Sequence, residues 1–155
     1  MYTDVVQWIV DSSLVKGKII GTHPGVMYFT IGERLGESKK TMIDNKYQNK
    51  IKGKLYVAGK DKKSNILLVA PDNHPILFKK QFKIIKVNWL VNPKNKEKVK
   101  VRIRHLGPLI PATIIKKNKT IKIKLNKGVR GLAEGQSCVI YKNSQILGGG
   151  EIRYT

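Results

Sequence analysis

The residues of this sequence best suited to chemistry are cations that alternate with apolar residues through residues 98–125. A period of two is typical of strands that bury one face and expose the other. The cations predicted for the exposed face are Lys100, Arg102, Arg104, Lys122 and Lys124. Ammonium and guanidinium groups donate hydrogen bonds and accept none, so the chemistry that this face can perform is the binding of anions.

Acidic residues are absent from the stretch that carries these cations. Between Glu97 and Glu134 there are eleven Lys and Arg and not one Asp or Glu, and the whole chain has a net charge of +21. An ordinary solvated strand face mixes both signs, and a compositional drift toward lysine would spread the cations evenly. We therefore favour a face that binds a polyanion, with nucleic acid as the partner. An anionic membrane fits less well, because there is no basic amphipathic helix and no long apolar run.

Candidate catalytic groups are few and scattered. His23, His74 and His105 lack the close paired spacing of a zinc site. Cys138 lies in an apolar strand pattern, where a thiol is more often a small buried hydrophobe than a nucleophile. The glycines at 148–150 are not followed by Lys-Ser/Thr, so we expect a β-bulge there rather than a phosphate-binding loop. From these residues alone we expect a basic β protein that binds and does not catalyse.

The pattern of elements predicts a mainly β protein. The 155 residues fit one large or two small domains. Short strands separated by turn signals indicate a barrel or sandwich. In the first half we expect strands at 16–21, 26–31, 54–59 and 65–70, a long surface loop at 33–54, and a break at 71–75; residues 2–10 fit a short helix or a strand equally. In the second half we expect strands at 82–90, 98–104, 113–116, 120–125, 137–141 and 145–154, with a loop at 128–135.

Several segments together resemble the bacterial tRNA-specific 2-thiouridylase family, which also carries the older name of a tRNA methyltransferase family. Its Gly-x-His-x-Gly loop and the following Tyr-Phe-Thr-Ile-Gly run are similar to GTHPGVMYFTIG at 21–32. Its central hairpin is similar to LYVAGKDKKSNILLV at 55–69. Its Arg-Tyr-Arg, Gly-Gln-x-x-Val-x-Tyr and Leu-Gly-Gly-Gly-x-Ile strands are similar to residues 102–111, 135–141 and 147–152. The order and spacing of the set make it specific, although each piece alone is weak.

The resemblance implies a small central β domain, residues 1–77, followed by a C-terminal antiparallel β-barrel, residues 78–155, both serving the grip on the tRNA anticodon arm. Arg104 and His105 take the places of the family's Arg-Tyr pair, and Gln136 takes that of its Gly-Gln glutamine, so the resemblance implies that these three contact tRNA. A turn residue that caps its strand is an equally good interpretation of Gln136. The sequence departs from the family at His105, at Leu106 and through residues 33–54, where Glu33 replaces a glutamine.

The resemblance also implies which part of the enzyme these residues represent. Family members begin with an ATP-binding domain that carries a Ser-Gly-Gly-x-Asp-Ser motif and two catalytic cysteines. That domain uses ATP to adenylate the wobble uridine and takes sulfur from a donor protein. None of those motifs is in this sequence. We therefore expect the tRNA-binding portion of such an enzyme, inactive alone and without a cofactor of its own. The alternative is a free-standing basic β-barrel adaptor that binds ribosomal RNA or a protein.

The compartment is expected to be the cytoplasm. The single cysteine excludes an internal disulfide and suits a reducing compartment. Residues 1–13 lack the basic start and long apolar run of a signal peptide.

Overall fold

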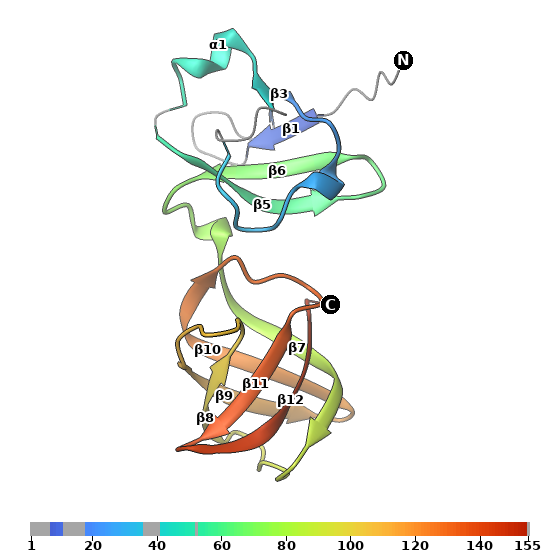
Figure 1. The fold of residues 1–155 in the computed structure, drawn as a ribbon, viewed down its shortest axis with the longest axis vertical. Coiled ribbons are helices and arrows are strands. Elements are labelled where there is room, and N and C mark those ends of the chain that lie inside the picture. The colour runs from blue at the N-terminus through green and yellow to red at the C-terminus, as the bar shows by residue number, and fades with distance from the viewer. Residues whose placement is uncertain (1–6, 11–17, 36–40, 52, 155) are drawn as a thin grey trace. The chain divides into compact units, whose positions relative to one another are not determined.

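The computed structural model describes residues 7–10, 18–35, 41–51 and 53–154, and it divides into two compact units, Met1–Phe78 and Lys79–Thr155 (Figure 1). Both units are built mainly from β-strands, as the sequence predicts. The first residues of the predicted strand at 16–21 lie outside the described residues, as do residues 2–6 of the segment predicted at 2–10.

The first unit is a small β domain with short helical turns. Its strands are β1 (Gln7–Val10), β2 (Lys18–Ile19), β3 (Gly21–Thr22), β4 (Met42–Ile43), β5 (Leu55–Asp61) and β6 (Ile66–Pro71), and its helices are η1 (Val26–Tyr28), α1 (Asn45–Gln48) and η2 (Pro75–Leu77). One sheet has the order β2-β1-β6-β5, and β3 pairs with β4. The core is formed by Ile20, Val26, Phe29, Leu35, Leu55, Val57, Leu67 and Val69.

The predicted hairpin of the first unit is confirmed as β5 and β6. Asp61 begins the turn, and its Oδ1 accepts hydrogen bonds from the backbone N–H groups of Lys63, at 2.9 Å, and Ser64. Asn65 follows with φ 54, a left-handed conformation that asparagine tolerates better than most residues. The side chain of Asn65 then accepts a hydrogen bond from Val26 N, at 3.1 Å, which ties the hairpin to η1.

The predicted strand at 26–31 is wrong. Val26–Tyr28 forms a 3₁₀ turn instead. Val26 and Phe29, three residues apart, are each 3% exposed, whereas Met27 and Tyr28 between them are 73% and 63% exposed. A spacing of three in the buried residues fits a 3₁₀ turn and not a strand of period two.

The predicted irregular loop at 33–54 is also wrong in part. It contains β4 and α1, and Leu35 within it is buried in the core. Residues 36–40 and 52 of that segment lie outside the described residues. The sequence does not predict these short elements because the segment is mostly polar, and only a few apolar residues, such as Leu35 and Ile43, pack them against the core.

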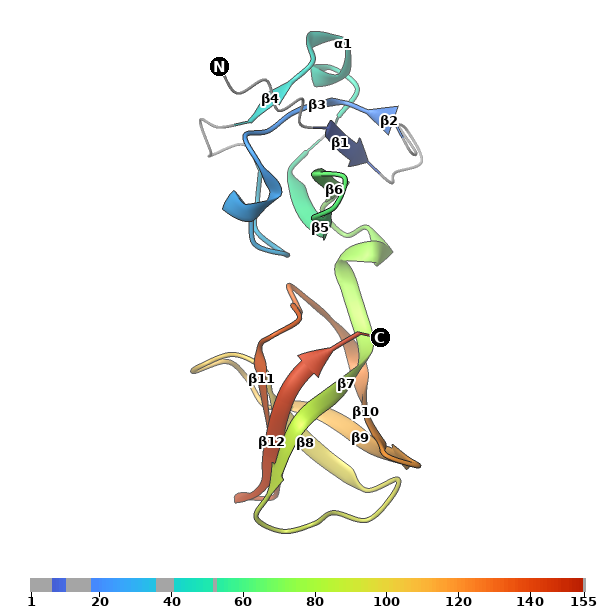
Figure 2. The same cartoon turned by 90° about the vertical axis from the view of Figure 1, so that its right-hand side faces the viewer.

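The second unit is a closed antiparallel β-barrel with the strand order β10-β7-β12-β11-β8-β9 (Figure 2). The predicted C-terminal barrel is therefore confirmed. Its strands are β7 (Phe78–Trp89), β8 (Lys98–Arg102), β9 (Ile110–Lys117), β10 (Thr120–Arg130), β11 (Ser137–Lys142) and β12 (Gln145–Arg153). Asn118 and Asn143 open the turns after β9 and β11 with φ 54 and 53, as two-residue hairpin turns favour.

Several strands of the barrel are longer than predicted, and β9, for example, spans Ile110–Lys117 instead of 113–116. β7 begins at Phe78 rather than at residue 82, and β10 continues to Arg130, through the first part of the predicted loop at 128–135. β10 borders both β9 and β7, and only Thr120–Leu125 pairs with β9. Closure of the barrel therefore requires a longer strand than the local pattern shows.

The three glycines of β12 allow close approach of neighbouring strands. A Cβ on Gly148 would lie 2.3 Å from the carbonyl oxygen of Asn88, and one on Gly149 would lie 2.4 Å from that of Cys138. The register shifts between Gly149 and Glu151, which confirms the predicted bulge. These glycines serve the packing of the barrel wall.

Candidate nucleic-acid interface

The predicted alternation of buried and exposed residues in β8 is confirmed. Val99, Val101 and Ile103 are buried in the barrel core, while Lys98 and Lys100 are exposed. The strand registers place Thr113 of β9 opposite Lys98 on one side and opposite Lys124 of β10 on the other. We call this outer surface of β8, β9 and β10 the cationic face. Its cations are Lys98, Lys100, Arg102, Lys122 and Lys124.

A hollow of about 550 Å³ lies at one edge of the cationic face. Thr113 and Ile115 line it from β9, and it is bordered by three lysines: Lys80, Lys96 and Lys124. The backbone N–H of Lys96 donates to Ile114 O at 2.8 Å, which fixes the loop before β8 against β9. Three ammonium groups around one concave surface make a suitable place for a phosphate group.

Of these three lysines, only Lys124 was among the predicted site residues. Lys80 lies in β7, and closure of the barrel brings β7 beside β10. Lys96 lies in the loop that precedes β8, with φ 61. The available sequence signal was the acid-poor stretch from 73 to 133, which includes both lysines but does not place them together.

Arg104 has two backbone partners at the end of the barrel. Its Nη2 donates to Arg130 O at 3.0 Å and to Gly131 O at 2.9 Å. His105 follows it, exposed, in a turn that also holds Leu106 at φ 57. These two hydrogen bonds hold the guanidinium of Arg104 in one position, and its other N–H groups have no hydrogen-bond partner within the part of the chain that the structure describes.

Gln136 borders the same loop as the partners of Arg104. Its Oε1 accepts from Ala133 N at 3.1 Å, and its backbone carbonyl accepts from Ile152 N at 2.8 Å. Gln136 therefore caps its own turn. Arg104 therefore contacts the first residues of the segment 130–136, and Gln136 is the last residue of the same segment.

The acidic residues of the barrel unit are engaged by cations. The unit has nineteen Lys and Arg and three acids, a net charge of +16. Glu97 pairs with Lys142 and accepts from Lys94 N at 2.7 Å. The hydrogen bond from Lys142 lowers the pKa of this carboxyl below its ordinary value. The carboxylate thus stays ionised and is locally compensated.

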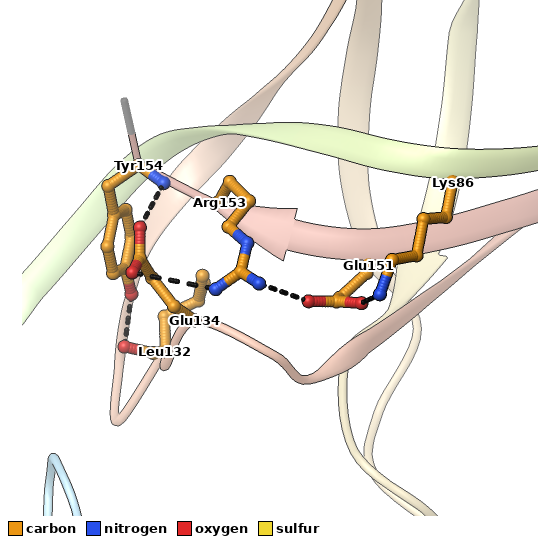
Figure 3. Close-up of polar contacts among 6 residues, drawn as sticks. All are labelled: Lys86, Leu132, Glu134, Glu151, Arg153 and Tyr154. Carbon is orange, nitrogen blue, oxygen red and sulfur yellow. Dashed lines mark hydrogen bonds and ion pairs between the residues drawn. The ribbon is translucent and has the colours of Figure 1, made fainter.

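Glu134 and Glu151 belong to a chain of polar contacts on β7, β12 and the loop at 131–136 (Figure 3). Glu151 accepts from Lys86 Nζ at 2.8 Å and from Arg153 Nη2 at 2.7 Å. Arg153 Nη1 lies 3.7 Å from Glu134, whose Oε1 accepts from Tyr154 N at 3.0 Å. Both signs of charge therefore alternate on this side of the barrel. Strands β8, β9 and β10 contain no acid, so the cations of the cationic face have no carboxylate beside them on their own strands.

Cys138 belongs to the core of the barrel. Cys138 is fully buried, and desolvation raises the pKa of its thiol to about 12, which confirms the predicted small hydrophobe. Among the residues that the structure describes, no three His, Cys, Asp or Glu side chains gather closely enough to hold a metal ion. No helix in the described part of the chain has the length and apolar character needed to cross a membrane.

Comparison with known proteins assigns both units. The family model for the tRNA methyl transferase PRC-barrel domain matches residues 9–71, and that for the aminomethyltransferase beta-barrel domain matches residues 79–152. The tRNA-specific 2-thiouridylase MnmA of Wolbachia pipientis wMel is 38% identical over an alignment 149 residues long, which covers 93% of this chain and 35% of that protein. The tRNA-specific 2-thiouridylase MnmA of Chlamydia abortus is 30% identical over an alignment 142 residues long, which covers 87% of this chain and 36% of that protein.

This chain belongs to the tRNA-specific 2-thiouridylase family. It spans about a third of the length of the curated relatives it matches. In this thiouridylase-family chain, the two matched regions correspond to the two units of the structure, and residues 72–78 between them contain η2. The cationic face and the hollow both lie in the second region, the β-barrel.

Proposed function

We propose that this chain is the tRNA-binding portion of a tRNA-specific 2-thiouridylase, and that its barrel binds the anticodon arm. The observation that carries this proposal is the cationic face, whose strands contain no acid and whose edge forms the hollow bordered by Lys80, Lys96 and Lys124. Phosphate contacts of this kind supply affinity and fix the register of an RNA without reading its sequence.

The geometry suits a phosphate backbone that runs across the strands. Alternate residues of one strand are about 6.6 Å apart, so Lys98, Lys100 and Arg102 form a row of cations along β8. Lys122 and Lys124 form a second row on β10, with β9 between them. Two parallel rows contact more phosphates than one row and hold the RNA in one orientation.

Arg104, His105 and Gln136 are proposed to contact tRNA at the end of the barrel. The anchored Arg104 guanidinium can bind a phosphate with its remaining N–H groups, and little entropy is lost because the group is already held. His105 is exposed beside it. The side-chain oxygen of Gln136 is occupied by Ala133 N, so Gln136 would donate from its amide nitrogen.

The chemistry is assigned to the rest of the enzyme. In this proposal an ATP-binding domain outside these residues activates the wobble uridine, and sulfur comes from a donor protein. The chain itself takes no cofactor and works in the cytoplasm, where its RNA substrate is modified. Cys138 has no part in sulfur transfer, because a buried thiol with a raised pKa forms almost no thiolate at neutral pH.

The test is equilibrium binding of the purified chain to two labelled RNAs of matched length: an unmodified tRNA with a uridine at the wobble position, and a fragment of ribosomal RNA. We expect tighter binding of the tRNA. Equal affinity for both RNAs would favour the adaptor that binds ribosomal RNA, and no binding of either RNA would refute the proposal.

A further inference from the structure

An aromatic side chain lies directly beside the cationic face. Tyr141 of β11 is paired in register with Lys100 of β8, and Arg102 lies diagonally across from it. The guanidinium carbon of Arg102 lies 5.5 Å from the centre of the Tyr141 ring. The Nε of Arg102 is buried and has no hydrogen-bond partner among the described residues. The guanidinium therefore lies within cation–π distance of the tyrosine ring.

A second hollow of about 470 Å³ lies over β12, and one of its lining residues, Ile146, is the strand neighbour of Tyr141. Gly149, which pairs with Val139, lines it and has no side chain. Leu90 and Ile146, which are 70% and 44% exposed, also line it, together with the ion pair of Lys86 and Glu151. Ile146 pairs with Tyr141 on the side away from Lys100. One continuous outer surface thus passes from apolar groups through an aromatic ring to cations.

We propose that this surface, formed by β12, β11 and β8, stacks an unpaired RNA base on Tyr141 while Lys100 and Arg102 hold the neighbouring phosphates. We call it the stacking face. This inference rests on the proposed function, because it assigns a second kind of contact to the same RNA-binding barrel. The base plane lies against the face of the ring opposite the Arg102 guanidinium, and the space beside Gly149 takes the next base.

Unpaired RNA fits this surface better than duplex RNA or a protein. The bases of a duplex are stacked on one another and do not present their planes to a side chain, whereas unpaired bases do. A protein partner would match the apolar rim but would have to supply acids for Lys100 and Arg102. A single strand carries an apolar base plane and a phosphate on every residue, which matches both parts of the face.

The experiment measures the binding of three fluorescein-labelled RNAs to the full chain by anisotropy: tRNA, a twelve-residue oligouridylate and a twelve-base-pair RNA duplex. The variants are Tyr141→Leu, which keeps an apolar side chain without the ring, and Tyr141→Phe, which keeps the ring. Tyr28→Leu is the matched control, because Tyr28 is an exposed tyrosine of the first unit. A thermal melt of each variant reports whether the barrel is folded.

We expect Tyr141→Leu to weaken binding of the oligouridylate between about fivefold and a hundredfold. Its binding of the duplex, and the dependence of binding on salt, should stay as in the wild type. Tyr141→Phe and Tyr28→Leu should bind all three RNAs as the wild type does.

Four outcomes would overturn the inference. If Tyr141→Leu binds the oligouridylate as tightly as the wild type, or loses the oligouridylate and the duplex equally, no base stacks on the ring. If the wild type binds tRNA and Tyr141→Leu keeps that full affinity, the stacking face fails while the proposed function stands, and a protein partner becomes the better occupant. If the wild type binds none of the RNAs, the proposed function fails and the stacking face fails with it.

Discussion

Replacement of Lys80, Lys96 and Lys124 by alanine should weaken tRNA binding and also make that binding less dependent on salt. Both effects have one cause, because the variant neutralises fewer phosphates. These three side chains border the hollow at the edge of the cationic face. Each phosphate that a cation neutralises releases counterions from the RNA, and dilution of the salt favours that release. The number of cations in contact therefore sets the slope of log affinity against log salt concentration.

The magnitude follows from the cations that the structure places on this side of the barrel. Together the cationic face and the hollow present seven: Lys80, Lys96, Lys98, Lys100, Arg102, Lys122 and Lys124. At roughly −0.7 to −0.9 for each neutralised phosphate, the wild-type slope should be about −5 to −6. Affinity should then fall about a thousandfold or more between 50 and 200 mM salt. The triple variant should lose roughly 2 to 3 from that slope, and about a hundredfold in affinity near 0.15 M salt.

The assay is a salt titration of labelled tRNA binding by fluorescence anisotropy. The matched control replaces Lys18, Lys62 and Lys63 of the first unit, which are exposed and change the net charge by the same amount. The control should leave the slope within experimental error of the wild type. If both triple variants lower the slope equally, tRNA responds to the net charge of the whole chain, and the cationic face has no special role in binding.

Four further predictions concern stability, reactivity and activity. Gly149→Ala should destabilise the barrel by about 1–3 kcal/mol in denaturant unfolding, because the new Cβ would lie 2.4 Å from a backbone carbonyl oxygen. Gly59→Ala is the control and should destabilise the chain less, because the nearest atom to its Cβ would be 3.6 Å away. Equal losses of stability would contradict the role of close strand approach at Gly149. Cys138 should react with a maleimide only when the barrel unfolds, since burial raises its pKa to about 12; rapid labelling of the folded chain would show that the thiol is accessible. Burial lowers the pKa of His23 below its ordinary 6.5, so the unfolded chain takes up this proton at a higher pH than the folded chain. The free energy of unfolding of the first unit should therefore be highest above about pH 6.5 and should decline as the pH falls toward the folded pKa. A flat profile in denaturant melts from pH 7.5 to 5.5 would argue against this. The chain alone should release no AMP from ATP in the presence of tRNA, and measurable release from the purified protein would reassign the chemistry.

The sequence by itself determined the class of fold and the inner and outer faces of its strands. In β8, alternation places Val99 and Val101 inside because successive side chains of a strand point to opposite faces. The hairpins β5–β6 and β11–β12 were equally readable, since their turn residues lie between the strands they join. The missing acids were visible as well, because charge is a property of composition. All of these features depend on residues close together in the chain.

Only the tertiary structure decided which residues share a site. Closure of the barrel places β7 beside β10 and the loop before β8 against β9, so Lys80 and Lys96 border the same hollow as Lys124. The pairing of β11 with β8 brings Tyr141 to Arg102 across nearly forty residues of chain. Local periodicity carries no information about such long-range neighbours, because they depend on strand order and register around the whole barrel. The same limit explains the wrong prediction at Val26–Tyr28. Its β-branched and aromatic residues favour a strand locally, but packing against the core of the first unit stabilises a 3₁₀ turn there.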